Sequence, residues 1–307
     1  MKSIASAALG FTLLSQATGA PGTGVVRTAD ITVRGLKASD FPRTKMLAEG
    51  VYSYEQIDPP KRTVTVNNLI VITAEGVVVV EGQGTVDNTR RLLSDISRLT
   101  AAPVRYVVIG SEHGAHIGGV TAFPPSATFI VHPKSKAELE RRLGRAAETV
   151  ADKRVLTLGG LEIDILFLGR AHTGGDLEVY LPRERILFTS EVFVNHIFPS
   201  MANGYPTEWL ATLKKAEQLD PAWYVPAHGF VDDAGTLKEE ERAFRSALER
   251  IVAEGRRLHD AGTDLDSASA AARFEPYDAW TRAANNAYGA LKRVYMELDG
   301  KLPDVRD

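Results

Sequence analysis

The amino-acid sequence predicts an α/β protein with four layers, in which two sheets face each other and helices cover their outer sides. Two observations predict this architecture. Short apolar runs typical of buried strands alternate with helix-compatible segments along most of the chain. A strand–turn–strand unit that ends in an acidic residue also occurs twice, at residues 71–81 and 179–191. Two similar halves, each a sheet with helices outside it, are expected to pack as a sandwich.

The expected strands are short and apolar. Residues 62–72 alternate polar and apolar side chains before becoming continuously apolar, as a strand that enters a core does. A turn at 73–76 separates this strand from a buried run of valines at 77–80. The remaining expected strands are 106–109, 128–131, 161–168, 177–181, 185–189 and 223–225. A turn at 182–184 makes the strands on either side of it a hairpin.

Helices are expected between these strands and after the last one. Those between strands are 86–99, 133–147 and 206–219, and the second begins with Pro133, which suits the first turn of a helix. From residue 232 the chain is helix-rich, with expected helices at 232–258, 265–273 and 277–298. Apolar residues recur at helical spacing in the first of these, at Leu248, Ile251, Val252 and Leu258. This stripe predicts packing on the sandwich, or else a lid or an interface of a homo-oligomer.

The first twenty residues have the pattern of a secretory signal peptide. Lys2 supplies a positive charge, residues 4–14 are apolar but too short to cross a bilayer, and small residues at 15–20 offer cleavage sites. This pattern leads us to expect a periplasmic or secreted protein. The alternative interpretation of these residues is a frayed helix in a cytosolic protein. Its expected parts are a signal peptide at 1–20, an extended lead-in at 21–45, the sandwich domain at 46–231 and a helical extension at 232–307.

The composition excludes several classes of function. The 307 residues carry a formal net charge of −3 and no long block of lysine or arginine, so no nucleic-acid partner is expected. Beyond the first twenty residues no apolar segment is long enough for a transmembrane helix, so no stable membrane insertion is expected. Cysteine is absent, which rules out disulfides, thiolate metal ligands and a thiol nucleophile. A small molecule is the expected partner.

Chemically capable side chains gather in four loops, each directly after an expected strand. Four of the seven histidines lie in these loops. The loops are residues 111–119 with His113 and His116, 169–176 with His172, 188–191 with Glu191, and 226–229 with His228. Such loops suit metal ligands and catalytic groups, because the sheet fixes their positions while they stay accessible. We therefore expect the four loops to form one polar site.

Taken together, these loops resemble those of the metallo-β-lactamase superfamily. Residues 171–176, Ala-His-Thr-Gly-Gly-Asp, resemble the family signature Gly-His-Thr-x-Gly-Asp, and residues 226–229, Pro-Ala-His-Gly, resemble Pro-Gly-His-Gly. The first loop resembles His-x-His-x-Asp-His followed by two glycines, with His113, His116 and the pair at 118–119 in register. The resemblance runs from about residue 51 to 229. It implies the four-layered metallo-β-lactamase fold with a helical C-terminal extension, and metal-dependent chemistry.

The resemblance also implies ligands for two metal ions, and each set has lost one ligand in this chain. The first set maps onto Ser111, His113 and His172, the second onto Ala115, His116 and His228, and the bridging aspartate onto Glu191. A hydroxyl is a poor ligand for zinc and a methyl group is no ligand at all. The ligands that remain are His113, His116, His172, Glu191 and His228.

Five ligands are enough for one metal ion and few for two. His113, His172 and Glu191 form a set of two histidines and one carboxylate, which suits a catalytic zinc ion and would also suit iron or manganese. His116 and His228 would then form a weak second site or act as acid/base groups. A single zinc ion is the expected cofactor, with two ions or a metal-free site as the alternatives.

Three functions are consistent with such a site. The leading expectation is a metal-dependent hydrolase of an ester, lactone, amide or related bond in a small molecule. Glu191 or His116 would take the proton, because Ala115 stands where the family has its aspartate. The alternatives are a non-hydrolytic lyase or dehalogenase-like enzyme that is metal-free or nearly so, and a catalytically inactive binding protein. Ser111 and His196 are the candidate substrate-binding residues.

Overall fold

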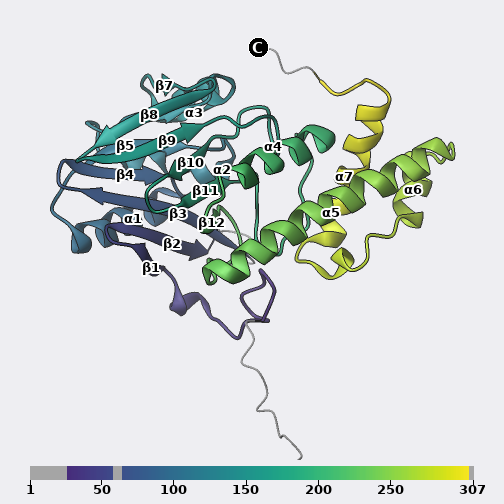
Figure 1. Cartoon of the computed structure of the whole chain (residues 1–307), viewed down its shortest axis with the longest axis horizontal. Coiled ribbons are helices and arrows are strands. Elements are labelled where there is room, and N and C mark those ends of the chain that lie inside the picture. Colours follow the sequence, from purple (N-terminus) through teal and green to yellow (C-terminus); the bar gives the residue numbers. More distant parts are fainter. Residues whose placement is uncertain (1–25, 58–63, 304–307) are drawn as a thin grey trace, which may run out of the picture.

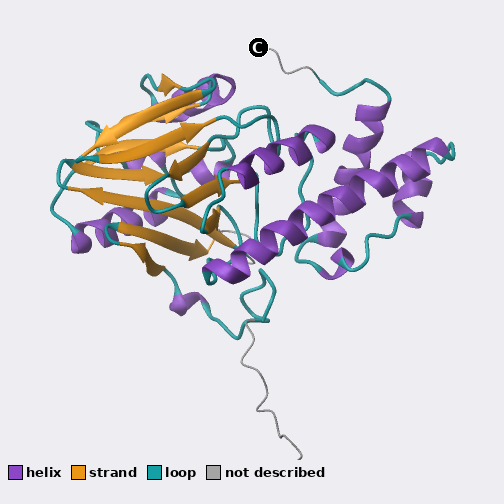
Figure 2. Ribbon diagram, in the orientation of Figure 1, coloured by secondary structure: helices purple, strands orange, loops and turns teal. Residues whose placement is uncertain are grey.

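The computed structural model describes residues 26–57 and 64–303, and within them the chain forms two sheets (Figure 2). The seven-stranded sheet follows chain order, from β1 (Arg43–Ala48) through β2 (Val51–Ile57), β3 (Thr65–Thr73), β4 (Gly76–Val80), β5 (Val104–Ile109) and β6 (Thr128–Val131) to β7 (Glu148–Thr149). The five-stranded sheet has the order β12 (Trp223–Pro226), β11 (Ile186–Ser190), β10 (Glu178–Leu181), β9 (Leu161–Leu166) and β8 (Lys153–Leu158).

The two sheets pack face to face, and β4 shows how the valine-rich strands serve two cores. Successive side chains of a strand point to opposite faces of its sheet. Val78 and Val80 belong to the core between the sheets, together with Phe188 of β11. Val77 and Val79 belong to a second core, on the other face of the seven-stranded sheet. A strand buried on both faces explains the continuously apolar run.

Helices cover the outer faces of both sheets. The second core contains residues of α1 (Val86–Leu99) and α3 (Lys136–Leu143), which therefore cover the seven-stranded sheet. The helices α4 (Pro206–Gln218) and α5 (Ala234–Asp260) lie on the five-stranded sheet (Figure 1). The helices α6 (Leu265–Ala271) and α7 (Ala283–Leu298) pack on α5. The expected four-layered fold with a helical C-terminal region is confirmed. None of the helices in the described ranges could span a membrane.

Two expected helices differ in extent. The segment expected as a helix at 133–147 begins with a short 3-10 turn, and its α-helix ends at Gly144, whose φ of 72° is left-handed. The segment expected at 277–298 is interrupted: a 3-10 turn (Tyr277–Ala279) precedes α7, and Arg282 between them has a φ of 66°. Helical periodicity alone does not reveal such breaks, because the apolar face continues across them.

Four strands have no counterpart in the sequence expectation. Three of them lie at sheet edges and expose many of their side chains: β1, β7 and β8. The strand β2 is buried, but it carries Ser53, Glu55 and Gln56, which broke its apolar pattern. Edge strands commonly carry charges and lack the apolar alternation by which strands are recognised.

The lead-in before β1 packs against the rest of the protein. Ile31 and Phe41 form a small core with Ile57 at the end of β2. The guanidinium of Arg34 donates two hydrogen bonds to the carboxylate of Asp232, at 2.6 and 2.8 Å. The described part of the lead-in is therefore held in place, and it lies close to the loops that follow the strands. The expected signal peptide at 1–20 falls outside the described residues.

Candidate active site

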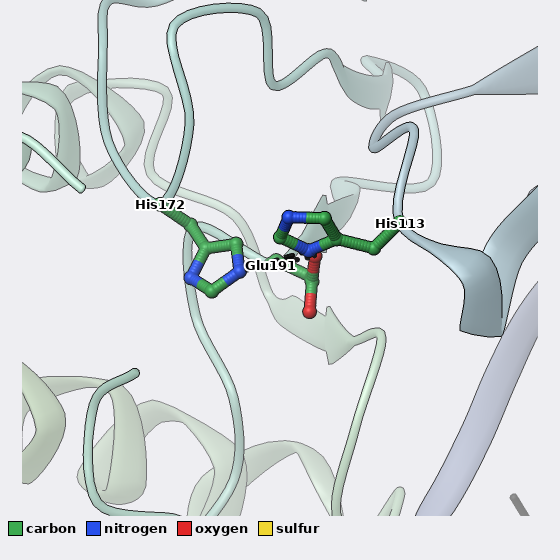
Figure 3. Close-up of side chains that lie close together, drawn as sticks. All are labelled: His113, His172 and Glu191. Carbon is green, nitrogen blue, oxygen red and sulfur yellow. Dashed lines mark hydrogen bonds and ion pairs between the residues drawn. The ribbon is translucent and has the colours of Figure 1, made fainter. Parts of the chain in front are cut away.

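The carboxylate of Glu191 is the centre around which the predicted site residues gather. Its Oε2 lies 2.7 Å from Nδ1 of His113 and 3.3 Å from Nε2 of His172 (Figure 3). Its Oε1 lies 3.3 Å from Nε2 of His228 and 3.8 Å from Nε2 of His116. The structure thus places the four histidines that the sequence proposed as metal ligands around the fifth proposed ligand, Glu191.

These side chains converge because each follows the end of a strand. His113 and His116 follow β5, and Glu191 and His228 follow β11 and β12, which run parallel to each other. His172 lies in the loop that connects β9 to β10. In α/β proteins, sites form at the carboxyl ends of parallel strands, where several loops leave the sheet at one edge. Local sequence therefore placed the residues on loops, and sheet topology brought the loops together.

Tight backbone packing holds the histidine loop in place. A Cβ atom on Gly118 would lie 2.1 Å from the carbonyl oxygen of Gly84, and one on Gly119 would lie 2.2 Å from that of Thr85. Only glycine allows such an approach between two backbone segments. The loop that carries His113 and His116 is thereby pressed against the segment that follows β4.

Charge in the site is distributed unevenly. Burial raises the pKa of Glu191, but the neighbouring His172 and His113 outweigh this and hold it well below its ordinary value. Burial lowers the pKa of His113, but the charge of Glu191 and the hydrogen bond to it raise it to about 9. Burial lowers the pKa of His172 to about 4. An ionised carboxylate beside one cationic and one neutral imidazole is a set of groups ready to exchange protons or to bind a cation.

Two groups of side chains, found among the described residues, have the arrangement needed for a metal ion. They are His113, His172 and Glu191, and His116, Glu191 and His228; within each group the ligand atoms lie within 4.8 Å of one another. Both ring nitrogens of His116 are buried without a hydrogen-bond partner. A buried polar atom without a partner calls for an explanation, and coordination to a metal ion would supply one. The donor set of imidazoles and one carboxylate fits zinc, and also iron or manganese.

Glu81 also belongs to this site, and the sequence analysis did not propose it. It directly follows β4, is completely buried and has a φ of 68°. Its Oε1 accepts a 2.6 Å hydrogen bond from the hydroxyl of Ser190, and its Oε2 lies 3.7 Å from Nδ1 of His116. A signal for it existed: Glu81 and Glu191 are the two acids that end the repeated strand–turn–strand units. The repeat thus marks two carboxylates on either side of His116.

The other predicted residues take different positions. Ser111 is buried beneath the site and donates a 2.7 Å hydrogen bond to Oε2 of Glu191. His196 packs its ring on that of Trp280, with centroids 4.9 Å apart, and its Nδ1 lies 3.1 Å from the carboxylate of Glu240. Neither residue is among those that line the cavity described next. Their role in substrate binding stays a prediction.

A cavity of about 850 Å³ opens onto the site. Its floor is formed by His113, His172, Glu191 and His228, and Trp209 and Ile197 supply apolar surface. Part of its wall comes from the lead-in, including Thr28 and Val33, and part from the residues around the start of α7, including Arg282 and Asn285. The volume is that of an ordinary small-molecule pocket.

The structure is a four-layered α/β sandwich with four histidines and one carboxylate gathered where its strands end, a donor set that suits a metal ion. The sequence profile described as the metallo-β-lactamase superfamily matches residues 62–228, more than half of the chain. The chain therefore belongs to the metallo-β-lactamase superfamily.

Individual relatives are distant. The chain is 26% identical to "Metallo-beta-lactamase type 2" of Bacillus sp. (strain 170) over 181 residues, which cover 56% of this chain and 69% of that protein. It is 22% identical to "Linear primary-alkylsulfatase" of Pseudomonas sp. (strain ATCC 19151) over 281 residues, which cover 73% of this chain and 53% of that protein. The solved structure of a metallo-β-lactamase from Pontibacter korlensis has a TM-score of 0.59 at 21% identity, over 67% of this chain and 99% of that chain. That structural likeness shows the fold alone.

Proposed function

We propose that this protein is a metal-dependent hydrolase that cleaves an ester, lactone, amide or related bond in a small molecule. The observation that carries the proposal is the convergence of four histidines on the carboxylate of Glu191 at the floor of a small-molecule cavity. Family membership supports it, because a β-lactamase and an alkylsulfatase are among the named relatives. Family membership does not by itself determine the substrate.

A single zinc ion held by His113, His172 and Glu191 is the cofactor that we propose. His113 and His172 face the cavity, whereas His116 is completely buried. Ala115 provides no ligand, and the hydroxyl of Ser111 is engaged as a donor to Glu191. When bound, zinc would polarise the scissile group and lower the pKa of a water molecule towards about 7.

The protein's own groups would then manage the proton. His116 lies between two carboxylates, with Nε2 at 3.8 Å from Glu191 and Nδ1 at 3.7 Å from Glu81. Burial lowers the pKa of His116, but the charges of Glu81 and Glu191 and the interaction with Glu191 outweigh this and raise it, which favours uptake of a proton by the imidazole. We propose that His116 and Glu191 together perform the general acid/base role for which Ala115 has no functional group.

The metal content of the purified protein tests this proposal. Full-length chain expressed in metal-replete medium is expected to contain about one equivalent of zinc, and His172→Ala should lose it, because a three-ligand site tolerates no missing ligand. His259→Ala, at the end of α5 and away from the cavity, is the matched control and should keep it. Two equivalents would establish a two-metal site. Absence of metal from the wild type would refute the proposal.

A lyase or dehalogenase-like reaction is the second candidate. The observation that favours it is the 2.7 Å contact between Nδ1 of His113 and Glu191, a carboxylate–imidazole pair that can hold and transfer a proton without a metal ion. Turnover that survives chelation but is lost in His113→Ala would support this candidate over the hydrolase. Ligand binding without any turnover would instead support a catalytically inactive binding protein.

We also propose export across the cytoplasmic membrane, from the signal-peptide pattern of residues 1–20. Sequencing the N-terminus of protein recovered from the periplasm or medium should place the start of the mature chain near residue 21. Recovery in the cytosol with Met1 or Lys2 at the N-terminus would refute export.

A further inference from the structure

A second pocket, of about 230 Å³, lies beside the loop that carries His172. Residues 173–175 line it, whereas His172 lines the larger cavity, and the two pockets share no lining residue. The charged side chains in its lining are those of Glu112, Lys134 and Arg293. Pockets for drug-sized molecules are usually larger, about 300–1,000 Å³, so the second pocket suits a small ion.

Arg293 is the unusual member of this lining. It lies on α7 and exposes only 5% of its surface. Its Nε donates a 2.8 Å hydrogen bond to the carbonyl oxygen of Gly204, but the N–H groups on its two terminal nitrogens have no acceptor among the described residues. Arginine is seldom buried without an acid beside it, because a charge that loses its hydration needs a partner.

The acids nearest to Arg293 are engaged by other donors. Glu297 lies one turn further along α7, and its carboxylate accepts hydrogen bonds from the hydroxyl of Thr207 at 2.7 Å and from its backbone N–H at 3.2 Å. Glu112 accepts a hydrogen bond from the hydroxyl of Ser135. Neither acid forms an ion pair with Arg293, so its positive charge stays unpaired within the described part of the chain.

A second arginine on the same aromatic ring shows the contrast. Arg170 lies 4.2 Å from the ring centre of Tyr205, and its Nε donates a 2.8 Å hydrogen bond to Glu208, which raises its pKa. Arg293 lies 5.6 Å from that ring centre. Burial lowers the pKa of Arg293, and the neighbouring Tyr205 and Glu297 do not offset this. A bound anion would supply the negative charge that the described residues do not.

We propose that the second pocket binds a small oxyanion, phosphate or a short-chain carboxylate, on the guanidinium of Arg293. The planar fork of N–H groups on a guanidinium suits either anion. Lys134 adds a second cation, and with Glu112 as the acid of the lining the pocket keeps one net positive charge. Binding of the anion does not depend on the proposed hydrolase activity.

Hydrogen bonds connect this pocket to the candidate active site. Arg293 holds the carbonyl oxygen of Gly204, and the backbone N–H of the next residue, Tyr205, donates a 2.9 Å hydrogen bond to the carbonyl oxygen of Ala171. Ala171 directly precedes His172. An anion that fixes Arg293 is therefore expected to restrain the backbone of the loop that carries His172.

Titration calorimetry of the chelator-treated full chain tests the proposal without metal or turnover. Inorganic phosphate and acetate are the probes, at constant ionic strength in a buffer free of other oxyanions. About one equivalent of at least one probe should bind, and the tighter probe identifies the anion class. Arg293→Met should weaken binding by about tenfold or more, the size of one charge-assisted hydrogen bond. Lys292→Met, the neighbouring exposed cation of α7 outside the pocket, should bind within about twofold of wild type.

Two further measurements keep the test independent of the folding of Arg293→Met, which also removes the donor to Gly204. Lys134→Gln changes an exposed side chain and should weaken binding by about twofold to fivefold. In wild type, the bound anion should slow hydrogen exchange of the backbone amides at 173–175 and 203–205. Slower exchange at 111–116 and 191–197 instead would place the anion in the larger cavity and overturn the proposal. So would an affinity that neither variant changes, or binding of neither probe.

Discussion

The hydroxyl of Ser190 donates a 2.6 Å hydrogen bond to Oε1 of Glu81 and joins the ends of two strands that belong to different sheets. Both residues are completely buried, and both have positive φ, 49° for Ser190 and 68° for Glu81. Left-handed backbone is costly for residues other than glycine, so their surroundings must impose it. This pair fixes the carboxylate of Glu81 beside His116 and couples the stability of the sandwich to the geometry of the site.

Ser190→Ala should therefore destabilise the protein by about 1–3 kcal/mol, because Oε1 of Glu81 would stay buried without its donor. Urea unfolding of chelator-treated protein measures the loss. Ser97→Ala is the matched control: its hydroxyl lies on the exposed face of α1, where it donates to the carbonyl oxygen of Ser94. The control should change stability by no more than about 0.5 kcal/mol. Equal losses in the two variants would contradict the coupling.

Gly118→Ala should destabilise the protein by about 1–3 kcal/mol and weaken metal binding, because the new Cβ would overlap the backbone of Gly84 and displace the histidine loop. Thermal unfolding and metal titration measure the two effects. Gly114→Ala, four residues earlier, should be tolerated, because no atom lies within 4 Å of the place that its new methyl group would take. If Gly118→Ala matched Gly114→Ala, the close backbone approach would not be what positions the loop.

Ala115→Asp should raise metal content from about one equivalent towards two, because it restores the carboxylate of the second ligand set and Ala115 is only partly buried. Elemental analysis measures this, with Ala115→Asn as the neutral control that should stay near one. A content of one equivalent in both variants would show that another ligand limits the second site.

Ser111→His, which restores the other missing ligand, should behave differently. Ser111 is completely buried and hydrogen-bonded to Glu191, so an imidazole has no space there. Overpacking should cost about 1–3 kcal/mol of stability in urea unfolding. A variant as stable as the wild type would mean that the site retains space for the lost histidine.

Glu241, on α5 beneath the five-stranded sheet, should make stability fall with rising pH. Burial, with help from Glu217, raises the pKa of Glu241 from 4.5 to about 8. The folded protein thus keeps a proton that the unfolded chain releases, so the contribution is complete below about pH 4.5 and is lost as pH rises towards 8. Glu241→Gln should gain stability relative to wild type across this window, by at most about 1.4 kcal/mol per pH unit.

Urea unfolding at pH 5, 7 and 9 measures that difference. Glu162→Gln, at an exposed position of β9, should show no pH-dependent difference from wild type. A constant difference between Glu241→Gln and wild type at all three pH values would mean that Glu241 is ionised in the folded protein throughout.

Most of the fold could be predicted because its elements are locally encoded. The helix α1 has the bounds expected from the sequence, and in the structure the side chain of Thr85 caps its first turn. The edge strand β8 and the break at Arg282 were not expected, because neither leaves a periodic pattern. Glu81 was noticed only as the end of a repeat, and its contact with His116 depends on the packing of separate loops.

The sequence by itself determined which side chains the loops present after each strand, because strand and helix periodicity are local properties. It therefore indicated His113, His116, His172, Glu191 and His228 as a common site. Only the tertiary structure decided that Glu191 is the shared centre, that Glu81 supports His116, and that Arg282 faces the same cavity. Such contacts join residues far apart in the chain, and they depend on how sheets and helices pack rather than on any pattern within one segment.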